Sequence, residues 1–256
     1  MRLAPYSFAS WCLLCGLANP VLAAQNESLA ATPYRPTVSN PAELSVPRHL
    51  EVEFGWSNSQ AVQLSKQSMQ YLGKYAFNEH WGVLFGGETL VRERNAEELY
   101  RGRGDTFLAV KHLLDLDTQG LGFEVGMNFT AAQSGKSTHS PDLFINGIHS
   151  IDFSEHWRLD TNLGLSQLRH AEEQTGHYVW LWVTCLGYST GNWGLAFEVA
   201  GNHQKHVANS TQVLTSVSYA INPRLVIDAA FTRMHQKQEF ENTILFGLTW
   251  LLDKKL

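Results

Sequence analysis

The sequence predicts an all-β protein, an antiparallel up-and-down transmembrane β-barrel of about 12 strands. Three features support this prediction: side chains alternate in polarity, short and long connections alternate along the chain, and the N-terminus has the composition of an export signal. In "HWRLDTNLGLSQL" (residues 156–168), bulky apolar residues mostly fill the odd positions, and polar or small residues mostly fill the even ones. Such alternation indicates a strand with one apolar and one polar face.

The N-terminal residues have the three parts of a secretory signal. Arg2 is followed by the apolar run "FASWCLLCGLA", and "PVLAAQ" then offers small residues for cleavage after Ala23 or Ala24. An apolar run of this length after a positive charge, with small residues at its end, is typical of a signal peptide. We therefore predict that residues 1–24 are a signal peptide that directs export.

The cysteines agree with export. Cys12 and Cys15 lie in the predicted signal, so Cys185 alone remains in the mature chain and no internal disulfide is expected there. The alternative is a lipoprotein signal acylated at Cys15. Leu14 disfavours it, because that processing requires a small residue at this position.

Residues 25–47 differ from the rest of the chain in composition. They are polar and contain Pro33, Pro36, Pro41 and Pro47, which prevent a regular helix or a central strand. We predict that they form an extended periplasmic leader or a plug, and that residues 48–256 form the barrel.

From Arg48 onward, one strand follows another. Segments of about ten to twelve residues are right for tilted strands that cross a membrane. The chain contains no apolar run long enough for a membrane-spanning helix. We expect strands at 48–57, 65–76, 81–90, 104–114, 120–130, 142–153, 157–168, 177–188, 193–202, 210–220, 224–233 and 242–252.

The connections predict how the barrel is oriented. Short turns are expected at 77–80, 115–120, 153–156, 189–192 and 221–224, and longer polar loops at 91–104, 131–141 and 169–177. Short periplasmic turns and longer outer loops are typical of barrels in the outer membrane of Gram-negative bacteria. An exported N-terminus starts in the periplasm, so the second connection, "FNEH" at 77–80, should be periplasmic. An even number of strands then returns the C-terminus to the periplasm.

The two faces of the strands predict which side meets lipid. One face carries large apolar and aromatic residues, and the other mixes glycine, alanine and charge, as expected for a lipid-facing wall around a crowded polar lumen. Tryptophans near the turns are expected to form an interfacial girdle; they are Trp81, Trp157, Trp193 and Trp250. The segment "YVWLWV" (178–183) is apolar on both faces. It packs either against a plug or in a narrow apolar part of the lumen.

Charged residues on the polar parity are the best candidates for a pore lining. Acids outnumber bases among them, so an open lumen would modestly favour cations and neutral polar solutes. In the alternative interpretation they pair with one another and fill a narrow interior, because enclosed charges need partners. The candidates are Glu51, Glu53, Lys66, Lys74, Glu88, Asp105, Lys111, Glu124, Asp152, Arg158, Asp160, Glu198, Arg224 and Asp228.

The sequence argues against several other functions. A net charge of −5 offers no basic surface for nucleic acid. Histidines in or beside the outer loops, including the "HQKH" motif (203–206), are more typical of solvated loops than of a metal site, so we expect no metal and no cofactor; they are His139, His170, His177, His203, His206 and His235. His149 and Ser150 are the nearest approach to a lipid-hydrolase pair. Because consecutive residues of a strand point to opposite faces, they cannot act together, and we expect no enzyme.

Several segments resemble a known family. They are "YRPTVSNPAELSVPRHLEVEFGW", "GRGDTFLAVKHLL", "FSEHWRLDTNLGLSQL", "AINPRLVIDAAF" and "LFGLTWLL", of which the leader "RPTVSNP" is the most specific. Together they are similar to the outer-membrane family named after the meta-pathway of phenol degradation, over nearly all of the mature chain. The resemblance implies a secreted outer-membrane barrel linked to the uptake of small, often aromatic, compounds.

Two positions depart from the pattern of this family. The family leader often has an acidic residue before Arg-Pro, where this chain has Tyr34. The last strand keeps the glycine and the aromatic residue of an outer-membrane assembly signal but continues through "DKKL". Recognition by the barrel-insertion machinery is therefore expected to rest on Trp250 and Leu252.

The prediction is a non-enzymatic, passive channel for small solutes, with aromatic or hydrophobic compounds among the candidates. The alternative is a closed structural or surface-binding barrel that works through its outer loops, and a lipid hydrolase is a weaker third. The expected partners are outer-membrane lipids, the barrel-insertion machinery and an unidentified small solute, and no nucleic acid.

Overall fold

The structure is a computed structural model that describes residues 29–95, 98–116, 119–131, 141–169 and 175–255. The predicted signal peptide (1–24), with Cys12 and Cys15, lies outside the described residues, as do His139 and His170. The described part contains strands, turns and loops, and no helix in it is long and apolar enough to cross a membrane.

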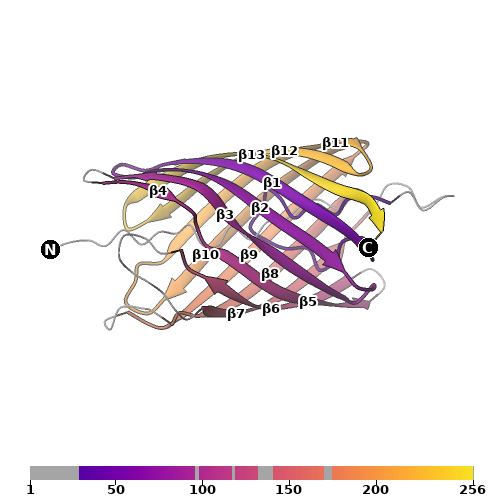
Figure 1. Ribbon diagram of the computed structural model, residues 1–256, viewed down its shortest axis with the longest axis horizontal. Helices are drawn as coiled ribbons and strands as arrows, with labels where there is room; N and C mark the ends of the chain where they lie inside the picture. The colour runs from indigo at the N-terminus through magenta and orange to yellow at the C-terminus, as the bar shows by residue number, and fades with distance from the viewer. Residues whose placement is uncertain (1–28, 96–97, 117–118, 132–140, 170–174, 256) are drawn as a thin grey trace.

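Twelve strands form a closed antiparallel barrel, which confirms the predicted fold class (Figure 1). β1 pairs with both β2 and β13, and this closes the ring. β4 lies outside the ring and pairs only with the end of β3. The strands are β1 (His49–Gln60), β2 (Ser65–Ala76), β3 (Trp81–Arg94), β4 (Leu99–Gly102), β5 (Thr106–Leu116), β6 (Gln119–Phe129), β7 (Asp142–Asp152), β8 (Trp157–Gln167), β9 (Tyr178–Thr190), β10 (Trp193–Gln204), β11 (Ser210–Asn222), β12 (Leu225–Gln236) and β13 (Glu239–Lys255).

The two ends of the barrel differ in their connections. The turn end carries the short connections after β2, β5, β7, β9 and β11, together with the C-terminus, and the loop end carries the other connections (Figure 1). Gly191, in the turn after β9, has a φ of 56°, which glycine adopts without strain. Two connections at the loop end depart from the predicted alternation. Residues 61–64, between β1 and β2, are no longer than the turn at 77–80, and β12 and β13 are joined through residues 237–238 alone.

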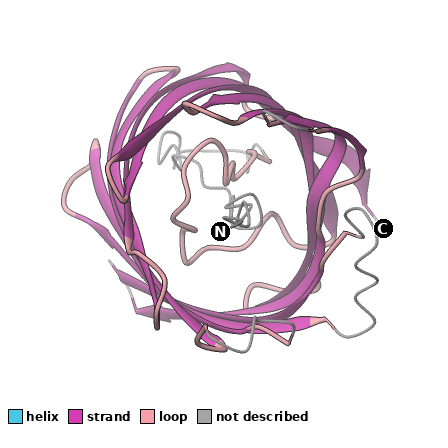
Figure 2. Ribbon diagram, turned by 90° about the vertical axis from the view of Figure 1, so that its left-hand side faces the viewer, coloured by secondary structure: helices cyan, strands magenta, loops and turns pink. Residues whose placement is uncertain are grey.

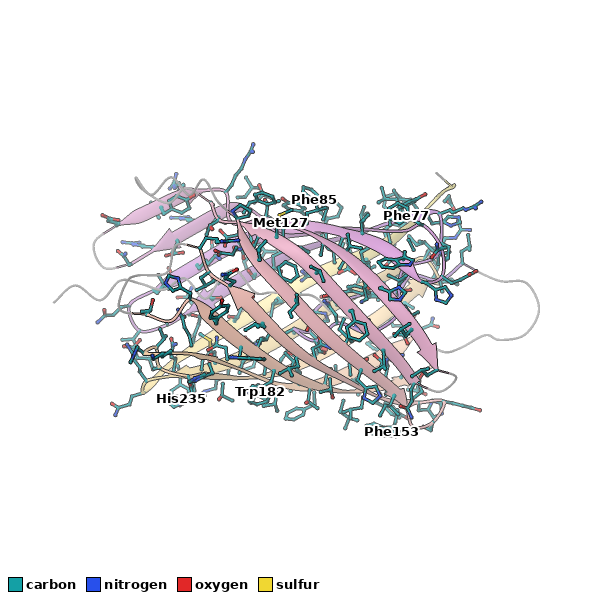
Figure 3. The ribbon with its side chains drawn as sticks, turned by 90° about the horizontal axis from the view of Figure 1, so that it is seen from below. Phe77, Phe85, Met127, Phe153, Trp182 and His235 are labelled. Atoms are coloured by element: carbon teal, nitrogen blue, oxygen red, sulfur yellow. The ribbon has the colours of Figure 1, made fainter. Side chains whose placement is uncertain are left out.

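The faces of the barrel are those of a wall between lipid and a polar interior. Phe85, Met127 and Trp182 project outward from three different strands (Figure 3) and are 51%, 38% and 44% exposed. Glu124 and Glu198, on the inner face, are fully buried. A soluble protein has the opposite arrangement, with its aromatic residues inside and its unpaired charges in water.

The predicted girdle tryptophans all lie at the turn end. Trp81, Trp157 and Trp193 are the first residues of β3, β8 and β10, and Trp250 is paired with Leu225 at the start of β12. All four are about half exposed on the outer wall. Their place in a membrane interface stays a prediction.

β3 contains a bulge that the sequence alternation did not predict. Leu90 has a φ of 49°, and the β2–β3 register shifts between Gln67 and Met69. Beyond this bulge the parity changes, so that Val91 and Glu93 face the interior. The start of the predicted outer loop 91–104 is therefore a continuation of β3, and it carries a buried carboxylate.

Residues 29–48 lie inside the barrel (Figure 2), and we call them the interior segment. At the turn end, Ala31 N donates to Pro223 O at 2.8 Å, and Arg48 N donates to Ala76 O at 2.7 Å. Both ends of the segment are therefore at the same mouth of the barrel. Between them the chain runs into the lumen and folds back.

Candidate functional site: the lumen and its interior segment

A buried charge cluster anchors the start of the interior segment. Lys74 Nζ lies between the carboxylates of Glu51 and Glu53, at 2.5 Å from the second, and donates to Thr32 O. The carboxylates in turn accept hydrogen bonds from Thr32 N (2.9 Å) and Tyr34 N (2.7 Å). The wall charges therefore pair with one another and also bind the segment.

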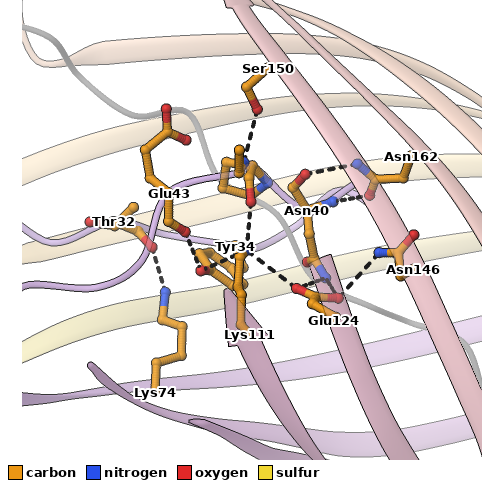
Figure 4. A network of polar contacts seen from close by, with 12 residues as sticks. Thr32, Tyr34, Asn40, Glu43, Lys74, Lys111, Glu124, Asn146, Ser150 and Asn162 are labelled. Carbon is orange, nitrogen blue, oxygen red and sulfur yellow. Dashed lines mark hydrogen bonds and ion pairs between the residues drawn. The ribbon is translucent and has the colours of Figure 1, made fainter. Parts of the chain in front are cut away.

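A second cluster holds the middle of the segment (Figure 4). Lys111 Nζ pairs with Glu124 at 3.2 Å and donates to Tyr34 Oη (3.0 Å) and Pro41 O (2.6 Å). Glu124 also accepts from Asn40 Nδ2, at 2.9 and 3.0 Å to its two oxygens. Tyr34 stands where the family leader often has an acidic residue, and here its hydroxyl and ring face two lysines.

Two polar side chains of the wall bind the backbone where the segment turns. Asn162 accepts from Asn40 N and donates to Asn40 O at 2.9 Å. Glu198 accepts from Val38 N at 2.9 Å and from Ser39 N at 2.8 Å. The wall thus provides hydrogen bonds for peptide groups that form no regular structure of their own.

The returning part of the segment meets a further ion network nearer the turn end. Arg158 pairs with Glu43 of the segment and, at 3.0 Å, with Asp160. Ser150 Oγ donates to Asp160 and accepts from Ala42 N at 2.8 Å.

Arg35 binds the wall beside the first charge cluster, on the neighbouring strands β2, β1, β13 and β12. Its guanidinium donates to Gln70 Oε1 at 2.9 Å and Phe246 O at 3.2 Å, and its Nε lies 3.5 Å from Asp228. The guanidinium lies over a paired glycine of β1 and one of β13, Gly55 and Gly247, where a side chain would occupy the same space.

We expect Gly55→Ala to destabilise the folded protein by about 1–3 kcal/mol, the cost of leaving buried polar groups unpaired. A Cβ at Gly55 would lie 2.0 Å from Arg35 Cζ, so the guanidinium would have to leave its partners. Chemical unfolding in detergent measures the effect. Gly73→Ala is the matched control, because its Cβ would meet only Phe85 O at 3.7 Å. Equal stability of the two variants would contradict the expectation.

The structure places the predicted lumen charges in three groups. Those that contact the interior segment directly are Glu51, Glu53, Lys74, Lys111, Glu124, Arg158, Glu198 and Asp228. Asp160 binds Arg158, Lys66 pairs with Glu88 at 2.5 Å, and Asp105 accepts from Ala131 N. Asp152 and Arg224 differ from the expectation: their side chains are 46% and 37% exposed at the turn end, because they stand beside turns. Whether any of these residues line a conducting path stays a prediction.

A cavity of about 80 Å³ lies on the loop side of the interior segment. Pro36, Thr37 and Val38 line it from the segment, and the other lining residues come from β1, β2, β3, β11, β12 and β13 and from Leu64. Its charged lining residues are Lys66, Glu88, Glu93 and Glu241.

Sequence reasoning missed two of these carboxylates. Glu93 fell within the predicted polar loop 91–104, although β3 continues to Arg94, and Glu241 preceded the predicted start of the last strand. It also missed the roles of Tyr34, Arg35 and Asn40. The glycines on the inner parity of β1 and β13 were the available signal, since they leave space that something bulky must fill.

The segment "YVWLWV" alternates in the structure despite its composition. Trp180 and Trp182 are exposed on the outer wall, while Val183 is buried in the interior. Cys185, two residues further on, is also buried and is a free thiol.

The structure separates the hydrolase pair. Ser150 Oγ is buried inside and bound to Asp160, whereas His149 Nε2 lies 3.1 Å from Gln119 Oε1 at an exposed position. Of the "HQKH" motif, His203 Nδ1 lies 2.8 Å from Asn209 Oδ1. In the described ranges, no three His, Cys, Asp or Glu side chains are grouped so as to hold a metal ion.

Comparisons with known proteins bear on the fold. No family model and no curated protein sequence matches the chain. The NanC porin is similar in structure, with a TM-score of 0.60 and 11% identity over 79% of this chain and 100% of the porin. The fold is that of an outer-membrane β-barrel.

Two further solved structures share this barrel. An outer-membrane channel from Pseudomonas putida F1 has a TM-score of 0.59 and 10% identity over 90% of this chain and all of its own. The CymD monoaromatic hydrocarbon channel has a TM-score of 0.51 and 10% identity over 81% of this chain and 89% of its own. Likeness at such low identity establishes a shared fold, and the resemblance to the phenol-degradation family stays a prediction.

Proposed function

We propose that the protein is a passive, non-enzymatic channel for small solutes in the outer membrane of a Gram-negative bacterium, with the interior segment narrowing its lumen. The observation that carries the proposal is the closed ring with apolar residues outside and buried charges inside. Such a wall suits lipid on one side and polar groups on the other. The likeness of the barrel to solved porins and channels supports it.

The same proposal includes an orientation and its partners. The turn end would face the periplasm, where the interior segment enters, and the loop end would face outward. Lipids would contact the outer wall. The barrel-insertion machinery would bind the last strand, in which Trp250 is 49% exposed and Leu252 follows two residues later.

The chemical class of the solute is a further part of the proposal. Membership of the phenol-degradation family would make small aromatic or hydrophobic compounds the cargo. The fold likeness to a channel for monoaromatic hydrocarbons is compatible with this class.

Planar-bilayer recordings of the purified protein test the channel. We expect small, reproducible current steps, because the interior segment leaves little of the lumen open. Glu124→Gln and Lys111→Met should change the step size, since each removes a partner of the segment. Glu155→Gln, in an exposed turn, is the matched control and should leave the steps unchanged.

Electrical silence of a barrel shown to be folded would contradict the channel. It would favour the second candidate, a closed barrel that binds partners through its outer loops. The bonds that hold the interior segment to opposite walls are the observation in favour of that candidate. Shortening an outer loop should then abolish the binding of the partner, while the barrel still conducts no current.

A further inference from the structure

Acidic side chains predominate among the charged residues that line the cavity on the loop side of the interior segment. Glu88, Glu93 and Glu241 line it together with a single cation, Lys66. Lys66 Nζ lies 2.5 Å from Glu88, which also accepts from Ser68 Oγ at 3.1 Å. The ammonium of Lys66 is therefore paired with Glu88, and no ion pair joins it to the carboxyl groups of Glu93 and Glu241 in the described structure.

Glu93 is the most informative of these carboxylates. It is only 9% exposed, and its Oε2 is buried with no hydrogen-bond partner among the described residues. Lys66 is its cross-strand neighbour, yet no ion pair within 4.0 Å joins their side chains in the described structure. Burying a carboxylate oxygen without a hydrogen-bond partner is unfavourable. The position of Glu93 Oε2 in a cavity wall therefore points to a ligand from solution that supplies the missing hydrogen bond.

The placement of Glu93 depends on a specific backbone feature. The bulge at Leu90 changes the parity of β3 and turns Glu93 toward the lumen instead of the outer wall. Bulges that re-aim a side chain occur preferentially beside functional sites. From β13, Glu241 lies beside Ser59 and Thr243, so polar groups converge on the cavity from separate strands.

The rest of the cavity lining is apolar to a large extent. Leu214 and Leu245 are buried in a common cluster, and Met234 and Val38 also line the space. A ligand that fits this lining would have a positively charged donor group and a short apolar body. An ammonium group donates up to three hydrogen bonds and matches carboxylate acceptors.

We propose that this cavity is a binding site for small organic ammonium compounds, held by Glu93 and Glu241 through the ammonium and by the leucines through the apolar part. The inference goes beyond the proposed function, because it adds a ligand class that the resemblance to the phenol-degradation family does not imply. The interior segment forms the floor of the site through Pro36, Thr37 and Val38.

Calorimetric titration of the purified full-length protein in detergent with n-butylammonium chloride at low salt tests the site. We expect saturable binding at one site, and binding of n-butanol and butyrate, the neutral and anionic analogues, weaker by about tenfold or more. Glu93→Gln should weaken n-butylammonium binding by about tenfold or more. Equal binding of butylammonium and butanol, or an unchanged affinity of Glu93→Gln, would overturn the proposal.

Glu93→Gln should still fold, because Glu93 Oε2 has no bond to lose within the described part of the chain. The heat-dependent gel shift of the variant verifies this, and Glu155→Gln serves as the matched control with unchanged affinity. Bilayer recordings separate the two proposals. Current steps without ammonium binding would overturn the site and keep the channel, whereas binding in an electrically silent barrel would keep the site and overturn the channel.

Discussion

Deleting residues 29–44 is expected to raise the single-channel conductance by about fivefold or more, because a lumen now crossed by a folded-back chain would fill with water. The strand registers do not involve these residues, so the ring should still close. The carboxylates that now bind the segment would gain water in its place. Planar-bilayer recording of the deletion beside the unmodified protein measures the change.

A sharper variant keeps the length of the segment and removes its side chains. Replacing residues 29–44 with a Gly/Ser sequence of equal length should give large, noisy steps, since the chain would remain present but unanchored. Both variants must first show the gel shift of a folded barrel. If a folded deletion variant conducts no more than the unmodified protein, the interior segment does not limit the current.

Lys74→Met is expected to lower the free energy of unfolding by about 3–5 kcal/mol, the usual cost of breaking a buried ion cluster by removing one partner. The substitution leaves Glu51 and Glu53 without their shared cation, and both are fully buried. It also removes the donor to Thr32 O, so the interior segment loses an anchor as well. Equilibrium unfolding in detergent, followed by tryptophan fluorescence, measures the loss.

The cause of this loss can be checked by neutralising the other side of the cluster. Adding Glu51→Gln and Glu53→Gln to Lys74→Met should restore most of the stability, because no uncompensated charge remains. Lys205→Met, at an exposed position, should change stability by less than about 0.5 kcal/mol. A single Lys74→Met variant as stable as Lys205→Met would show that the cluster does not stabilise the fold.

The alternation of polar and apolar residues was sufficient to predict most of the strands. β8 and β10 begin where the alternation predicts, at Trp157 and Trp193, and the predicted turns at 77–80 and 153–156 occur unchanged. Large apolar side chains face lipid, and small or charged side chains face the lumen. The alternation of residues within each strand therefore indicates both of its environments. This is why the all-β class, the strand positions and the inner parity of residues such as Glu124 and Lys111 could be predicted without any tertiary information.

In β3 the alternation of residues did not predict which side chains face the interior. A bulge at Leu90 reverses the parity, and no strict alternation can foresee it, because the backbone accommodates the extra residue only against its neighbours in β2. The predicted strands were also too short at the loop end, where β3 continues to Arg94 and β13 begins at Glu239. The polarity rule weakens there because both faces of the hairpin carry polar residues.

By itself, the sequence determined a barrel wall, its strand order and a proline-rich segment that could not be a strand. Only the tertiary structure decided where that segment lies and what it touches. Tyr34 meets Lys111, and Asn40 meets Glu124, across separations of 77 and 84 residues. Such contacts depend on which parts of the wall the returning chain can reach. Closure of the ring and the space over Gly55 and Gly247 determine which wall residues the interior segment can contact. The alternation of residues along the strands does not indicate these contacts.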